Sequence, residues 1–103
     1  MLRRLRRYRV VGESMMPTLL PGQSVLVDPR AFRKRLPGVG ELVQLRDPRQ
    51  LDRMLLKRVR SVEEARVFVL GDNPSSSTDS REFGAAPMEL ILGRVVCTFT
   101  GSN

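Results

Sequence analysis

Glycine and proline interrupt this chain at short intervals, and their spacing limits what it can fold into. The interruptions fall at Pro17, Pro21-Gly22, Pro29, Pro37-Gly38, Pro48, Gly71, Pro74 and Gly84. Both residues disfavour helix interiors, so the intervening segments favour short β-strands over long helices. We predict strands over residues 8–11, 24–27, 41–46, 54–62, 66–70 and 93–100, with helical turns only after Pro17 and near residues 87–90. The chain is therefore predicted to be mostly β, with a coiled, barrel-like sheet and little helix.

The length of 103 residues fits one domain. We assign residues 1–9 to a basic N-terminal extension and residues 10–103 to that domain. Aromatic residues make up only 5% of the chain, so valine, leucine, isoleucine and methionine must build the core. No apolar run approaches the roughly 18 residues of a membrane-spanning helix, and none of signal-peptide length follows the basic start. These features predict a cytoplasmic protein without a transmembrane segment.

The net charge of +7 rests on arginine, because only Lys34 and Lys57 among the 18 basic residues are lysines. Such a charge suits a nucleic acid, an anionic membrane surface or an acidic protein, although a solvated basic face is the simpler interpretation. Tyr8 is the only tyrosine, tryptophan is absent, and no aromatic pair is spaced to stack bases. We therefore expect no nucleic-acid partner, whereas the arginines of residues 1–9 are suited to peripheral contact with an anionic membrane.

Histidine is absent and Cys97 is the only cysteine. An internal disulfide is thereby excluded, and almost no route to a zinc site remains. No run of aspartate and glutamate resembles a loop that binds Mg²⁺ or Ca²⁺. We expect neither a metal nor another cofactor, and a Ser-His-Asp triad is ruled out.

Ser14 stands on a short bend in the stretch VVGESMMPTLLPG, residues 10–22. It is either an ordinary turn residue or a nucleophile raised from the end of a strand. The pattern G-x-S-x-G fails because Met16 replaces the second glycine, and S-x-x-K fails because Pro17 occupies the lysine position. Arginine stays protonated, so a nucleophilic serine here needs a carboxylate or a lysine as its base. Of the two lysines, Lys34 lies in an Arg-Lys-Arg run and is expected in solvent.

Lys57 lies in the predicted strand MLLKRVRSV, residues 54–62. Side chains alternate between the two faces of a strand, so Leu55, Lys57 and Val59 share one face. If that face is buried, desolvation lowers the lysine pKa from ~10.4 toward the range that a general base requires. Alternation alone leaves the opposite arrangement equally open, with Lys57 in solvent and Arg58 and Arg60 turned inward.

A long polar loop, VLGDNPSSSTDSREFG, covers residues 69–84. As structure it is a cluster of turns in which short polar side chains bond to nearby backbone groups. As a functional element it supplies hydroxyl groups to orient an amine. It also supplies Asp79 and Arg81, two residues apart, as an internal ion pair.

Three segments in this order resemble the type I signal peptidases. They are Gly12-Glu13-Ser14-Met15-Met16-Pro17-Thr18-Leu19, then Lys57-Arg58-Val59, then Gly71-Asp72-Asn73 continuing through Ser77, Asp79-Ser80-Arg81 and Phe83-Gly84. The resemblance extends over nearly all of residues 10–96. It implies a mostly-β serine endopeptidase whose base is a lysine and whose substrate is a protein precursor.

By position, the resemblance implies that Ser14 is the nucleophile and Lys57 the general base. Ser77 matches the serine that orients the lysine, and Asp79 and Arg81 match a supporting ion pair.

The residues around the nucleophile receive roles in the same way. Some members carry a serine two residues before the nucleophile that donates to the oxyanion hole, and here that position is Gly12. The oxyanion would then rely on backbone N–H groups, chiefly that of Ser14. Met15 and Met16 are expected to contact the substrate.

Most type I signal peptidases carry an N-terminal membrane anchor and a periplasmic insertion, and we expect neither in this chain. A short, arginine-rich chain resembles instead the maturation proteases of nickel-type superoxide dismutase, which remove an N-terminal propeptide. A general leader peptidase is the alternative. A self-cleaving repressor-type protease is disfavoured, because nine residues before Val10 cannot form a DNA-binding domain. A basic module that binds nucleic acid or an acidic partner explains the charge but not the motif spacing.

Overall fold

The computed structural model describes residues 4–99, which form one sheet of seven strands. The strands are β1 (Arg6–Arg9), β2 (Ser24–Asp28), β3 (Leu42–Asp47), β4 (Gln50–Glu63), β5 (Arg66–Leu70), β6 (Ala86–Pro87) and β7 (Ile91–Phe99). Their order across the sheet is β1-β2-β7-β3-β4-β5-β6, and all neighbours are antiparallel. The prediction of a mostly-β fold is confirmed.

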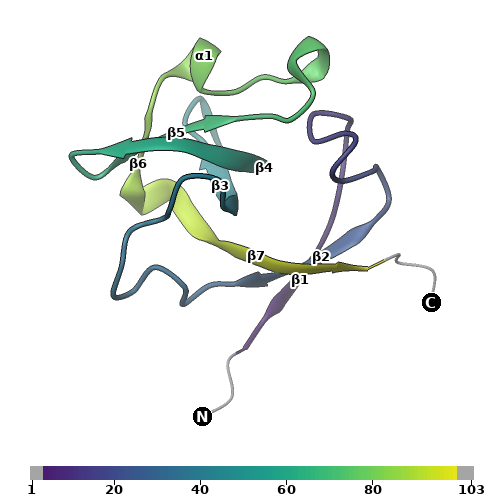
Figure 1. Cartoon of the computed structure of the whole chain (residues 1–103), viewed down its shortest axis with the longest axis horizontal. Helices are drawn as coiled ribbons and strands as arrows, with labels where there is room; N and C mark the ends of the chain where they lie inside the picture. Colours follow the sequence, from purple (N-terminus) through teal and green to yellow (C-terminus); the bar gives the residue numbers. More distant parts are fainter. Residues whose placement is uncertain (1–3, 100–103) are drawn as a thin grey trace.

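Irregular pairing bends this sheet. The register shifts at Leu26/Val27, Gln44/Leu45, Arg46/Asp47 and Val59/Ser61. Such bulges bend a strand and increase its twist. The sheet consequently coils, so that β3 to β6 stand on one side and β1, β2 and β7 on the other (Figure 1).

Strand β4 is much longer than either neighbour. Gln50 and residues 54 to 58 of β4 pair with β3, whereas β5 pairs only with residues from Arg58 to Glu63. Between Gln50 and Lys57, no strand of the described chain covers the second edge of β4. This edge is therefore open to an added strand, although the carbonyls of Leu51 and Met54 already accept side-chain hydrogen bonds from Arg46 and Tyr8.

Two apolar clusters form the core, one on each side of β4. Leu56 packs into the first cluster, whereas Leu55 and Val59 of the same strand pack into the second. The first cluster contains Val10, Met15, Leu19, Val25, Val27, Leu56 and Val95, and the second contains Val43, Leu45, Leu55, Val59, Val67, Val69 and Ala86. Because both faces of β4 are covered here, a polar side chain on either face is removed from water.

Strands occur at all six predicted positions, with shifted ends. Strand β1 begins earlier than predicted and lies within the stretch assigned to the basic extension. The predicted end at residue 100, like residues 1–3 of that extension, lies outside the described part of the chain. The turn near residues 87–90 is a 3₁₀ turn at Met88–Leu90, and the turn at Pro17 covers residues 14–18.

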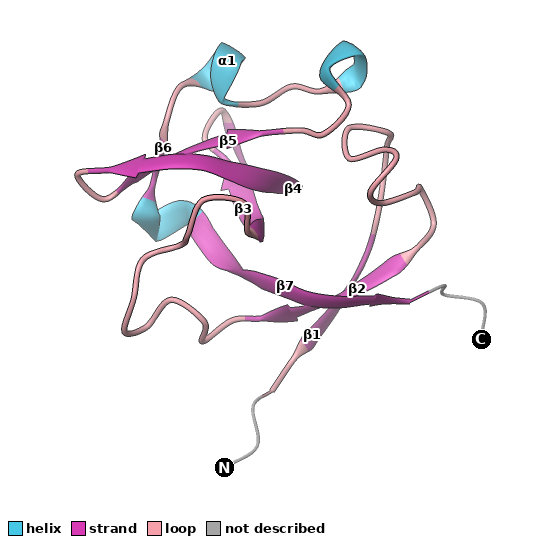
Figure 2. Cartoon of the chain, in the orientation of Figure 1, coloured by secondary structure: helices cyan, strands magenta, loops and turns pink. Residues whose placement is uncertain are grey.

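Three short elements were missed by the sequence prediction: β6, a 3₁₀ turn at Pro74–Ser76, and α1 (Ser80–Phe83). Elements of two to four residues are too short to show a hydrophobic period. Figure 2 shows how little of the chain is helical. Among the described residues, no helix has both the length and the apolar character needed to cross a bilayer.

Candidate active site

A cavity of about 370 Å³ opens between β4, the turn after β1 and the loop that follows β5. It is lined by Tyr8, residues 10–15, residues 53–57, Ser76 and Thr78. Gly12, Ser14, Met15 and Lys57 therefore face one space, although they are far apart in sequence. Met16, predicted to contact substrate, is not part of this lining.

Lys57 is buried on β4, with only 2% of its surface exposed. Its Nζ donates a hydrogen bond to Ser77 Oγ over 3.2 Å. Burial lowers the pKa of the Lys57 amine, the carboxylate of Asp79 opposes that shift, and the charge of Arg53 adds to it. The core-facing arrangement is therefore the one adopted, and it favours a neutral amine. Lys34 is exposed, as predicted.

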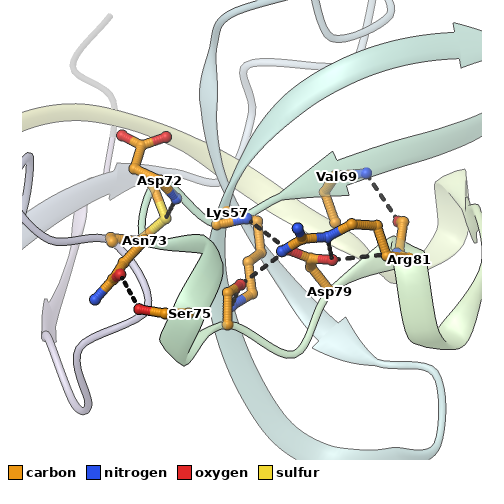
Figure 3. A network of polar contacts seen from close by, with 11 residues as sticks. Lys57, Val69, Asp72, Asn73, Ser75, Asp79 and Arg81 are labelled. Atoms are coloured by element: carbon orange, nitrogen blue, oxygen red, sulfur yellow. Dashed lines mark hydrogen bonds and ion pairs between the residues drawn. The ribbon is translucent and has the colours of Figure 1, made fainter.

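Asp79 holds the other side of Ser77. Its Oδ2 accepts hydrogen bonds from Ser77 Oγ and from the N–H of Gly71, each over 2.9 Å. Arg81 Nε and Nη2 contact the two carboxylate oxygens at 3.0 and 2.9 Å, which forms the ion pair seen in Figure 3. Burial alone would raise the pKa of the fully buried Asp79, but these hydrogen bonds hold it well below its usual range. A charged Asp79 thus fixes the Ser77 hydroxyl beside Lys57.

The turn that carries Ser14 is tied to the loop after β5. The backbone N–H of Asn73 donates to the Ser14 carbonyl over 2.9 Å, and its side-chain amide donates to the Glu13 carbonyl over 3.0 Å. Met15 is buried beneath the turn. Ser14 itself is half-buried, and no hydrogen bond joins it directly to Lys57 within residues 4–99. The two residues both line the cavity.

A second ion pair braces the same turn from outside the cavity. Asp72 accepts hydrogen bonds from Thr18 Oγ1 over 2.6 Å and from Arg58 Nε and Nη2 over 2.9 and 2.7 Å. Arg58 also donates to the Gly40 carbonyl over 2.8 Å. Hydrogen bonding by Arg58, together with that of Thr18, lowers the pKa of Asp72 despite partial burial. The bridge links the Ser14 turn to the strand position next to Lys57.

This bridge joins segments that share no local sequence pattern. The stretch Gly71-Asp72-Asn73 was part of the resemblance, but it gave no indication that Asp72 reaches Thr18 and Arg58. The segments are separated by 54 and 14 residues, so only folding brings them together.

The proposed oxyanion side of the cavity is formed by backbone. Gly12 has a φ of 81°, a conformation that favours glycine, and it is exposed. Within the described residues, the N–H of Ser14 donates to no protein group. Nor does that part of the chain contain a cluster of three or more metal-ligating side chains.

Comparison with known proteins shows which protein family this chain belongs to. The model of the family described as "Signal peptidase, peptidase S26" matches residues 3–63 and 60–100. Mitochondrial ATP-independent inner membrane protease subunit 1a of Arabidopsis thaliana is 34% identical over 110 aligned positions, covering 84% of this chain and 66% of that protein. Mitochondrial inner membrane protease subunit 1 of Saccharomyces cerevisiae is 38% identical over 79 positions, covering 77% of this chain and 36% of that protein. The chain thus spans just under two thirds, or less, of these relatives' lengths.

These relatives correct two sequence-based expectations. They carry the names of inner membrane proteases, so the prediction of a cytoplasmic protein is wrong. None of them is named for nickel superoxide dismutase, so the narrower resemblance has no support. The broader resemblance is confirmed: the chain belongs to the signal peptidase family S26.

Proposed function

We propose that this chain is a serine endopeptidase that removes leader segments from precursor proteins at a membrane, with Ser14 as nucleophile and Lys57 as general base. The observation that carries the proposal is that Ser14 and the buried Lys57 amine line one cavity. The names of the relatives favour a membrane-associated leader peptidase over a superoxide dismutase maturation protease.

The chemistry follows from a lysine whose pKa is lowered by burial, which makes the neutral, proton-accepting form of the amine more accessible. Lys57 Nζ accepts the hydroxyl proton as Ser14 Oγ attacks the scissile carbonyl carbon. The tetrahedral oxyanion is stabilised by backbone N–H groups, chiefly that of Ser14. When the peptide C–N bond breaks, the Lys57 ammonium protonates the leaving amine. Water then attacks the acyl ester while Lys57 takes its proton. The Lys57 ammonium gives that proton to Ser14 Oγ as the ester bond breaks, which restores the serine hydroxyl and the neutral amine.

Three supporting residues keep the amine in place. Ser77 bonds to Nζ, Asp79 orients Ser77, and Arg81 holds Asp79 charged. We propose these as positioning roles, because none of the three lines the cavity.

The uncovered edge of β4 provides the means of holding an extended peptide. Residues 53–57 line the cavity and lack a strand partner on that edge among the described residues. A peptide added there gains main-chain hydrogen bonds while its alternate side chains enter the cavity. The scissile carbonyl is thereby brought between Ser14 and Lys57.

Mass spectrometry of synthetic precursor peptides provides the test. The peptides carry small residues at a single candidate cleavage position, as secretory leaders do. We expect one cut by the wild-type chain and none by Ser14→Ala or Lys57→Ala, while Lys34→Ala cuts normally because that lysine is exposed. Full cleavage by either cavity variant would overturn the assignment. Salt-sensitive nucleic-acid binding without any cleavage would instead support a basic binding module.

A further inference from the structure

The cavity presents one cation to solvent besides the buried lysine. Its charged lining residues are Glu13, Arg53 and Lys57. Lys57 is buried and its pKa is lowered, whereas the Arg53 side chain is 55% exposed and stays charged. Glu13 directly precedes Ser14 in the sequence. Arg53 lies four residues along β4 from Lys57 and acts at a distance from the scissile bond.

Arg53 is only loosely engaged by the protein. Its Nη1 lies 3.9 Å from Asp47 Oδ2, at the outer limit of an ion pair. Asp47 is already bonded by Arg49, whose backbone N–H and guanidinium both contact its carboxylate. The Arg53 guanidinium therefore retains donors for another carboxylate, and guanidinium–carboxylate pairing is well suited to recognition.

The position of Arg53 on β4 sets where that carboxylate would lie. Leu55 and Lys57 alternate onto one face of β4. Arg53 precedes them where the register shifts opposite Arg46/Asp47, and it lines the same cavity beside the edge that no described strand covers. Four residues of strand span about 13 Å, and a paired peptide advances at the same rate. A peptide side chain near Arg53 is then about three or four residues from the scissile bond.

We propose that Arg53 is a specificity-determining residue that selects an acidic side chain of the peptide substrate at that position. The proposal rests on the peptidase function proposed above, and it adds a substrate class: peptides with aspartate or glutamate on one side of the cut. The charge of Arg53 also bears on the Lys57 amine. A substitution at Arg53 therefore changes the rate for every peptide. Selection is reported only by the ratio of kcat/KM between two peptides that differ in the acidic residue alone.

The test uses two series of fluorescein-labelled ten-residue peptides built from alanine, serine and leucine. One series carries a single glutamate at each position in turn, and the other carries glutamine. For the wild-type chain we expect kcat/KM to be roughly fivefold higher for glutamate than for glutamine at one or two adjacent positions, mainly through KM. Arg53→Gln should abolish this preference for glutamate. Arg53→Glu should instead prefer lysine over glutamine at the same positions in a matching lysine series.

Arg60→Gln is the matched control, because Arg60 is an exposed arginine of the same strand outside this cavity. It should keep the wild-type ratio. Absence of a glutamate preference in the wild-type chain, or its survival in Arg53→Gln, would overturn the inference while leaving the peptidase function standing.

Anisotropy of the same peptides with the Ser14→Ala chain separates the two proposals. If no peptide is cut but glutamate still improves binding and Arg53→Gln abolishes that gain, the peptidase function fails and the selection by Arg53 holds. If no peptide binds, both fail.

Discussion

Gly71 lies where the turn carrying Ser14 comes closest to the loop carrying Ser77. A Cβ added to Gly71 would overlap Ser77 Oγ and would lie 2.6 Å from Ser77 Cβ and 2.7 Å from the Ser14 carbonyl oxygen. Gly71 is not in the left-handed region of φ, so lack of space alone excludes a side chain there. The substitution Gly71→Ala therefore forces the two segments apart.

The size of the effect follows from these distances. To reach an ordinary contact of about 3.4 Å, the Ser14 carbonyl oxygen must move away by about 0.7 Å and Ser77 Cβ by about 0.8 Å, and Ser77 Oγ must move further than either. Overpacking of this kind costs roughly 1–3 kcal/mol of the free energy of unfolding. A misplacement approaching 1 Å at reacting groups costs about 100-fold in rate. We expect Gly71→Ala to stay folded and to lose about 100-fold in kcat/KM.

Two other glycines supply matched controls, each measured by urea unfolding and peptide cleavage. At Gly93 a Cβ would overlap the Asp28 carbonyl oxygen and lie 2.8 Å from Val27 Cγ1, far from the cavity lining. Gly93→Ala should lose similar stability but little activity per folded molecule. At Gly38 the nearest atom is 3.5 Å away, so Gly38→Ala should change neither quantity. Wild-type kcat/KM in Gly71→Ala, or an equal loss in Gly93→Ala, would refute the reasoning.

Three further predictions concern the groups behind the cavity. Lys57→Met should be inactive. Its free energy of unfolding should exceed that of the wild-type chain, and this difference should shrink from pH 7 to pH 10. The reason is that the unfolded lysine, with a pKa of ~10.4, binds more protons than the buried amine in that window; urea titrations showing a constant difference would contradict this. Ser77→Ala should lower kcat roughly 10- to 100-fold, as loss of other orienting groups does, and should shift the pH profile. Ser80→Ala, which removes a buried hydrogen bond to the Val69 backbone, should cost about 1 kcal/mol without that shift; equal pH profiles for the two variants would argue against orientation by Ser77. Asp79→Asn should cost about 2 kcal/mol at pH 7, by loss of charge-assisted hydrogen bonds. Because the folded pKa of Asp79 is depressed, wild-type stability from this group is complete above the unfolded value of ~3.9 and is lost at lower pH. The difference in free energy of unfolding between Asp79→Asn and wild type should therefore narrow as the pH is lowered. A difference that persists to pH 2 would contradict this prediction.

The sequence alone was sufficient to place six of the seven strands and to nominate the candidate chemistry. Glycine and proline mark the turns between strands through their own backbone preferences, and these preferences do not depend on distant residues. The absence of histidine and the presence of two lysines left few bases for Ser14. Helix α1 was also open to prediction, because Asp79 followed by Glu82 has the spacing of a capping box, and Asp79 does cap the helix.

Contacts between distant segments were not predictable in this way. The place of β7 between β2 and β3, and the bridge from Thr18 through Asp72 to Arg58, join residues that share no local pattern. The position of Arg53 in the cavity likewise depends on which part of β4 is left without a strand partner.

Lys57 shows most clearly where local sequence stops being sufficient. Its residue type and its motif determined that it was the candidate base, but alternation left both faces of the strand open to it. Leu55 and Leu56 are neighbours on opposite faces, and each packs into a different core cluster. A strand buried on both faces has no polar side by which its orientation can be assigned. Only the tertiary structure, in which Ser77 of the loop after β5 bonds to the amine, decided that Lys57 is removed from water and lines the same cavity as Ser14.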